Sequence, residues 1–153
     1  MCLENDGFVV IEDFLSEKEV EEMKEEAGNL IKSMPERSKR TVFSTKDAEN
    51  QQNRDKYFLD SGNNISYFFE AGALDGEGNL LVDSKVSLNK IGHALHSLIP
   101  VFRKVSLSEK VKECAFQLGF QDPAICQSMY IFKNPGIGSE GNVKVHEDCA
   151  VYC

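Results

Sequence analysis

The stretch Val143-Lys144-Val145-His146-Glu147-Asp148 bears most directly on the fold, because it predicts a β-strand that carries metal-binding side chains. Side chains alternate between the two faces of a strand, so His146 and Asp148 would lie on the same face. A histidine nitrogen and a carboxylate oxygen placed in this way are two of the three ligands of a 2-His-1-carboxylate iron site. The stretch therefore indicates a sheet that presents part of an iron centre.

The same residues allow two other interpretations. H-x-D is a short motif, and His146 with Asp148 can be a structural histidine beside a surface carboxylate. His146, Cys149 and Cys153, with or without Asp148, are also ligand types that zinc accepts if the terminal segment curls. The residues by themselves leave these alternatives open.

Upstream of this strand, the sequence predicts an amphipathic helix that begins after Ser16. Ser16 and Glu19 have the spacing of a capping box, in which each side chain binds the other residue's backbone N–H. Apolar residues then recur at helical spacing until Pro35 ends the run.

Two further helices are expected in the middle of the chain. Residues 87–99 carry apolar side chains at helical spacing, and Pro100 would close that helix. Another helix would open with a capping box formed by Ser106 and Glu109 and end at Gly119. His93 and His96 would then share a helical face as packing or rim residues rather than as metal ligands.

Strands are expected at four places besides the His146 segment. Residues 8–11 read as a short buried strand, and residues 65–69 read as a strand whose hairpin partner is 80–82. Residues 125–132 are also rich in β-forming types. The order predicts an α+β chain, with N-terminal helices followed by the first strands of a sheet that is incomplete at residue 153 and leaves an open edge.

Composition narrows the function classes. The formal net charge of -8 argues against binding to nucleic acid, which requires Lys and Arg to neutralise phosphates. No apolar run approaches the roughly 20 residues that span a bilayer, and no signal peptide is visible, so an intracellular, cytoplasmic protein is expected. Five cysteines in such a chain indicate reduced thiols, with Cys114 and Cys126 as small core residues.

Four blocks of sequence, at residues 6–11, 67–70, 89–96 and 127–133, resemble the phytanoyl-CoA dioxygenase family. The resemblance runs in order over nearly the whole chain but covers about the first half of what the family normally contains. It implies an iron(II)- and 2-oxoglutarate-dependent oxygenase built on a double-stranded β-helix of the jelly-roll or cupin kind. The substrate would be a small organic molecule, of acyl type in this family.

The resemblance also implies roles for individual residues. His146 and Asp148 would be iron ligands, Lys90 and Met129 would line the 2-oxoglutarate site, and Glu147 would lie beside that cosubstrate. Glu147 departs from the family, where glutamine is more usual, and an ionised carboxylate there would repel 2-oxoglutarate.

The family's second iron-binding histidine and the arginine that pairs with 2-oxoglutarate lie further downstream than residue 153. The sequence therefore predicts a single, C-terminally truncated domain over residues 1–153, with weak or no oxygenase activity of its own. The alternative is a non-enzymatic isoform that acts through partner binding or self-association at its open sheet edge.

Overall fold

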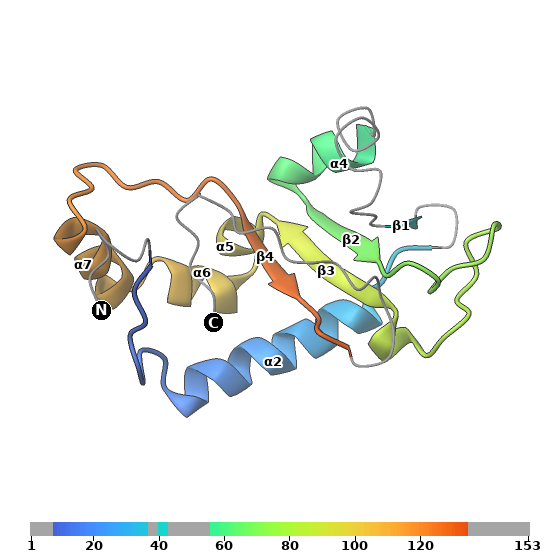
Figure 1. Cartoon of the computed structure of the whole chain (residues 1–153), viewed down its shortest axis with the longest axis horizontal. Coiled ribbons are helices and arrows are strands. Elements are labelled where there is room, and N and C mark those ends of the chain that lie inside the picture. The colour runs from blue at the N-terminus through green and yellow to red at the C-terminus, as the bar shows by residue number, and fades with distance from the viewer. Residues whose placement is uncertain (1–7, 37–39, 43–55, 135–153) are drawn as a thin grey trace.

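The computed structural model describes residues 8–36, 40–42 and 56–134 of the chain (Figure 1). In this part of the chain a small twisted sheet is combined with one long helix and several short ones, an α+β composition. None of the helices in these ranges is both long and apolar enough to cross a membrane.

The long helix, α2 (Glu17–Lys32), begins as the sequence predicted. The Ser16 hydroxyl accepts a hydrogen bond from the backbone N–H of Glu19 at 3.3 Å, and the Ser16 backbone N–H donates to the Glu19 carboxylate at 2.8 Å. This reciprocal capping box satisfies two backbone donors that the first helical turn leaves unpaired. The helix buries Met23, Ala27 and Leu30 along one stripe.

The sheet has four strands in the order in which they occur along the chain. The first strand runs parallel to its neighbour, and the other pairs are antiparallel. The strands are β1 (Thr41–Val42), β2 (Ile65–Phe69), β3 (Leu88–His93) and β4 (Ser128–Ile131). The short helices between them are α4 (Lys56–Asp60), η2 (Ser61–Asn63), η3 (Ser84–Val86), α5 (Leu95–Leu98), α6 (Pro100–Ser106) and α7 (Glu109–Gln117).

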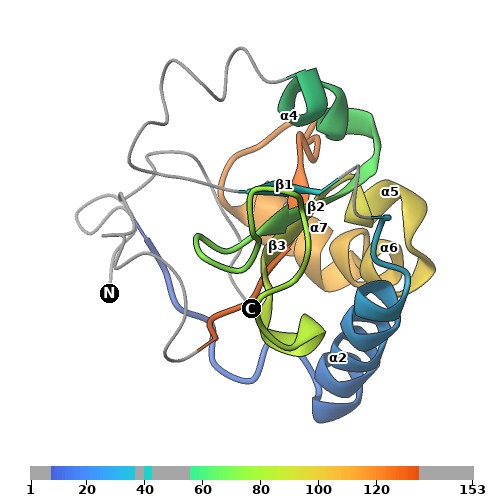
Figure 2. The ribbon, with the colours of Figure 1, turned by 90° about the vertical axis from the view of Figure 1, so that its right-hand side faces the viewer.

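The hydrophobic core lies between one face of the sheet and helices α2, α5 and α6 (Figure 2). Phe69, Leu88 and Ile91 supply the sheet side and are fully buried. Leu95 and Phe102 pack against them from the helices. In Figure 1, helix α4 and helix α2 lie on opposite sides of the strands. The face of the sheet that does not pack on α2 is therefore surrounded by other side chains.

The predicted helix over residues 87–99 is wrong. Residues 88–93 form β3, the central antiparallel strand between β2 and β4, and Pro100 opens α6 at its first position rather than closing a helix. The apolar spacing of this segment fits a helix and also fits a strand that is buried on both faces. Pairing with two neighbouring strands decided the outcome, and strands consequently alternate with helices instead of following them.

Two of the expected strands also differ. Residues 8–11 are an exposed, irregular segment rather than a buried strand, because in the described part of the chain they pair with no other strand. The turn around Asp75 to Asn79 is present, but the following residues make a single bridge between Leu74 and Leu80 and do not pair with β2.

Helix α7 begins later than predicted, with Ser108 as its N-cap, because Ser106 is the last residue of α6. Gly119 follows its end at φ 90°, as expected for a helix C-terminus.

Cys114 is half-buried, but Cys126 is exposed, so the prediction that both cysteines lie in the core is wrong for Cys126. Cys126 lies in an irregular stretch before β4, which the β-rich composition did not distinguish from the strand itself.

Candidate functional site

The face of the sheet opposite the core is centred on Phe68 and Lys90. These residues are register partners on β2 and β3, so their side chains lie next to each other on the same face. Phe68 is 1% exposed and Lys90 is 7% exposed. The Lys90 Nζ atom lies 5.2 Å from the centroid of the Phe68 ring, within the range of a cation–π interaction.

Burial of the Lys90 amine changes its acid–base behaviour. Desolvation lowers the pKa of Lys90 from 10.5 to about 8, because an ammonium ion loses the water that stabilises its charge. At neutral pH the amine is still mostly protonated. A partly desolvated cation of this kind binds a carboxylate more strongly than an exposed lysine does.

Met129 lies beside Lys90 on the next strand. Its Cα is the register partner of Gly92, and Gly92 is two residues from Lys90 along β3, on the same face. A Cβ atom added at Gly92 would lie 3.1 Å from the Met129 Cβ, so the missing side chain lets β4 approach β3 closely. The structure thus places two of the predicted site residues, Lys90 and Met129, on one face of adjacent strands.

His93 is the last residue of β3 and lies at the end of this face. Its Nδ1 atom lies 2.7 Å from the Ser61 hydroxyl, and its ring packs against Phe68 with 5.4 Å between centroids. Burial, and secondarily the charge of Lys90, lower the pKa of His93 from 6.5 to about 4. The imidazole is therefore neutral at physiological pH.

Tyr57 holds helix α4 against the same face. Its hydroxyl accepts a hydrogen bond from the Tyr67 backbone N–H at 2.9 Å and donates to the Tyr67 carbonyl at 3.3 Å, so it occupies backbone groups of β2 that would otherwise need a strand partner. Its ring meets Phe68 edge-on at 5.7 Å between centroids. Helix α4 and the η2 turn thus flank Phe68 on this side.

The predicted iron ligands His146 and Asp148, and Glu147 between them, lie outside the described residues. Among the residues that the structure describes, no group of three His, Cys, Asp or Glu side chains is arranged to hold a metal ion.

His93 and His96 do not share a helical face as the sequence predicted. His93 ends β3, whereas His96 belongs to α5, and each is bonded to its own serine. The Nδ1 atom of His96 lies 2.7 Å from the Ser128 hydroxyl, which also accepts a hydrogen bond from the His96 backbone N–H at 2.8 Å. The two imidazoles therefore serve different parts of the fold.

Ser61, Phe68, His93 and Tyr57 form a cluster with Lys90. The sequence did not identify these four residues as members of a site. Phe68 belongs to a strand that the sequence predicted correctly, so alternation alone could have placed it opposite the core residues Tyr67 and Phe69. Ser61 gives no such signal, because its role depends on a partner 32 residues away.

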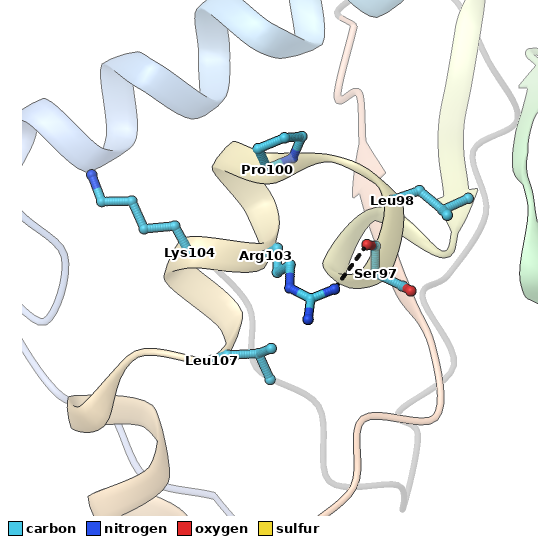
Figure 3. A pocket seen from close by; sticks show the side chains of 6 residues that line it. All are labelled: Ser97, Leu98, Pro100, Arg103, Lys104 and Leu107. Atoms are coloured by element: carbon cyan, nitrogen blue, oxygen red, sulfur yellow. Dashed lines mark hydrogen bonds between the residues drawn. The ribbon is translucent and has the colours of Figure 1, made fainter.

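An open depression lies on α5 and α6 and is lined by none of the site residues described above (Figure 3). Its two cations are directed elsewhere. Arg103 bends back to donate to the Ser97 carbonyl at 3.4 Å, and Lys104 extends towards α2, where it lies 3.3 Å from Glu22. The depression offers an apolar rim of Leu98 and Leu107 but no convergent polar groups.

Comparison with known proteins identifies the family of the whole chain. The model of the family described as Phytanoyl-CoA dioxygenase (PhyH) matches residues 3–153. The chain is 46% identical over 150 residues to phytanoyl-CoA dioxygenase domain-containing protein 1 of Bos taurus, covering 96% of this chain and 51% of that protein. It is 43% identical over 146 residues to the Caenorhabditis elegans homologue of that protein, covering 95% and 50%.

A plant protein named phytanoyl-CoA dioxygenase, from Arabidopsis thaliana, is 40% identical over 142 residues, covering 93% of this chain and 48% of that protein. The chain therefore spans about half the length of the curated relatives that it matches. The family predicted from the four sequence blocks is confirmed, and the chain belongs to the phytanoyl-CoA dioxygenase family.

Proposed function

We propose that this chain contributes the first sheet and the cosubstrate-binding surface of an iron(II)- and 2-oxoglutarate-dependent oxygenase. The single observation that carries the proposal is the buried Lys90 amine, which lies over Phe68 on the face of the sheet opposite the hydrophobic core, in a chain that belongs to an oxygenase family. The substrate would be a small organic molecule of acyl type, in keeping with the names of the relatives.

The described residues fit a 2-oxo dicarboxylic acid. The protonated Lys90 amine, supported from below by the Phe68 ring, would bind one carboxylate through charge-assisted hydrogen bonds, and Met129 would contact the apolar part of the molecule. Neutral His93 would add no competing charge to this surface. These residues bind and orient the cosubstrate and exclude water from it.

His146 and Asp148 would hold the iron, because a neutral imidazole and a carboxylate are the donors that non-haem iron(II) oxygenases use. Iron with 2-oxoglutarate supplies the oxidising power that inserts an oxygen atom from O2 into a C–H bond of the substrate. Glu147, between the two ligands, would weaken cosubstrate binding if it is ionised there. We further propose that the four-stranded sheet belongs to a double-stranded β-helix.

The test is an anaerobic titration of the purified chain with iron(II), with and without 2-oxoglutarate, monitored through the visible charge-transfer band of a chelated 2-oxo acid. A saturable band that disappears in His146→Ala and weakens in Lys90→Met supports the proposal. Lys85→Met is the matched control, because Lys85 lies in the exposed η3 turn and should leave the band unchanged. Absence of a band from the folded wild-type chain would refute the proposal for this chain.

A non-enzymatic role is the second candidate, and the position of β4 favours it. In the described part of the chain β4 is an edge strand, and Ile131 at its end is 39% exposed. An edge strand of this kind can pair with a partner or with a second copy. Sedimentation velocity over a range of concentrations tests self-association, which should be lost when Ile131 is replaced by Lys.

A further inference from the structure

We infer that the hydrogen-bonded pair Ser61 and His93 is a positioning device that holds the Lys90 amine over Phe68, where it can bind a carboxylate. The use of that position for a 2-oxo acid rests on the proposed function above. The positioning itself rests on the contacts of the described residues.

The pair ties two distant segments together at the end of the sheet. Ser61 opens the η2 turn and His93 ends β3, and the two residues are 1% and 3% exposed. Besides the 2.7 Å contact between Ser61 Oγ and His93 Nδ1, the His93 backbone N–H donates to the Asn64 carbonyl at 3.1 Å. The turn that follows α4 is therefore fixed to β3 by a side-chain bond and a backbone bond.

Phe68 transmits this constraint to Lys90. Its ring lies 5.4 Å from the His93 ring and 5.7 Å from the Tyr57 ring, centroid to centroid, and 5.2 Å from the Lys90 Nζ atom. A buried ring packed on several sides has few alternative rotamers, because interiors are close-packed. If the Ser61 bond is lost, His93 and Phe68 gain freedom and the amine is no longer held in its desolvated position.

The chain contains a matched comparison for this pair. His96 and Ser128 form a bond of the same kind, also 2.7 Å long and also between residues 32 positions apart. That pair joins α5 to the start of β4, and His96 is only half-buried. Its loss should reduce stability without releasing Lys90.

The experiment measures the pKa of Lys90 by NMR in chains labelled with ¹³C-lysine, with the Lys90 signal assigned from Lys90→Arg. Asparagine places an amide near the position of the histidine Nδ1, and glutamine places it near Nε2. His93→Asn should therefore keep the Ser61 bond and leave the pKa of Lys90 near 8. Ser61→Ala and His93→Gln should let it rise towards the ordinary value of 10.5.

His96→Gln is the control and should leave the Lys90 pKa unchanged. Ser61→Ala removes one oxygen atom and so keeps the test usable if substitutions at His93 prevent folding. An unchanged Lys90 pKa in folded Ser61→Ala, or an equal rise in His96→Gln, would overturn the inference.

A second measurement separates this inference from the proposed function. The dissociation constant of 2-oxoglutarate, taken from the charge-transfer titration, should rise on the order of tenfold in Ser61→Ala and recover in His93→Asn. If the wild-type chain gives no band, the proposed function fails while the Lys90 titration still decides the positioning role.

Discussion

The Cβ of Met129 would lie 3.1 Å from a Cβ atom at Gly92, and the Ser128 carbonyl oxygen would be equally close to it. β3 and β4 thus meet at a point where only glycine fits without displacement. Because Met129 belongs to the proposed cosubstrate surface, a substitution at Gly92 would act on that surface through the backbone of β4.

Gly92→Ala should therefore destabilise the chain by about 1–3 kcal/mol, the usual range for overpacking a buried position. Chemical denaturation measures the change in the free energy of unfolding. Gly28→Ala is the control, because a Cβ at Gly28 meets nothing within 4 Å in the middle of α2 and should stabilise the helix by about 1 kcal/mol. Equal effects at the two glycines would contradict the close approach of β4.

Lys90→Met should remove a pH dependence of the free energy of unfolding. The folded state lowers the pKa of Lys90 from 10.5 to about 8, because burial penalises the charged amine. Between about pH 8 and pH 10.5, the unfolded chain keeps the proton on Lys90 while the folded chain has lost it. Wild-type stability should therefore rise with pH in that window, and Lys90→Met should lack this rise.

Thermal unfolding of the two proteins at pH 7 and pH 10 measures this difference. An equal change in stability from pH 7 to pH 10 in both proteins would show that the Lys90 amine does not cause the pH dependence.

His93 should make the chain sensitive to mild acid. Its pKa is lowered from 6.5 to about 4 in the folded state, so in this window only the unfolded chain takes up the proton. Above about pH 6.5, His93 should not reduce the free energy of unfolding. The free energy of unfolding should then fall as the pH drops from 6.5 towards 4. His93→Asn lacks the titrating group, and denaturation curves collected from pH 7 to pH 4 should show a flatter dependence for this variant than for wild type.

A salt bridge between Lys110 and Glu19 should govern stability at lower pH. Lys110 Nζ lies 2.7 Å from Glu19 Oε2 and 2.8 Å from the Phe14 carbonyl, and so links α7 to the capping box of α2. The hydrogen bond from Lys110, followed by those from Ser16, lowers the pKa of Glu19 from 4.5 to about 2. The ionised Glu19 carboxylate therefore contributes to the stability of the fold above about pH 4.5, and this contribution is lost as the pH falls towards 2.

Lys110→Met should flatten the pH dependence of stability in that acid window. Lys112→Met is the matched control, since Lys112 binds Glu109 only within the first turns of exposed α7 and should leave the dependence unchanged. A flattening of the same size in both variants would show that the link between α7 and α2 does not cause the effect.

The candidate site could be predicted from the sequence only through the family resemblance. That resemblance singled out Lys90 and Met129, and the structure puts them on one face of adjacent strands. The helix predicted for residues 87–99 would have given Lys90 a different environment. No local pattern connects Ser61 to His93, because the bond joins a turn to a strand end that only tertiary folding brings together.

The sequence by itself determined the features that depend on near neighbours along the chain. The capping box of α2 and the C-terminal glycine of α7 need only residues within one turn, and the β2 segment carries enough β-forming side chains to be recognised locally. Tertiary structure decided whether residues 88–93 became helix or strand, since their apolar spacing satisfies both and only pairing with β2 and β4 distinguishes them. It also decided the burial of Lys90, because desolvation depends on what the rest of the chain packs around the amine.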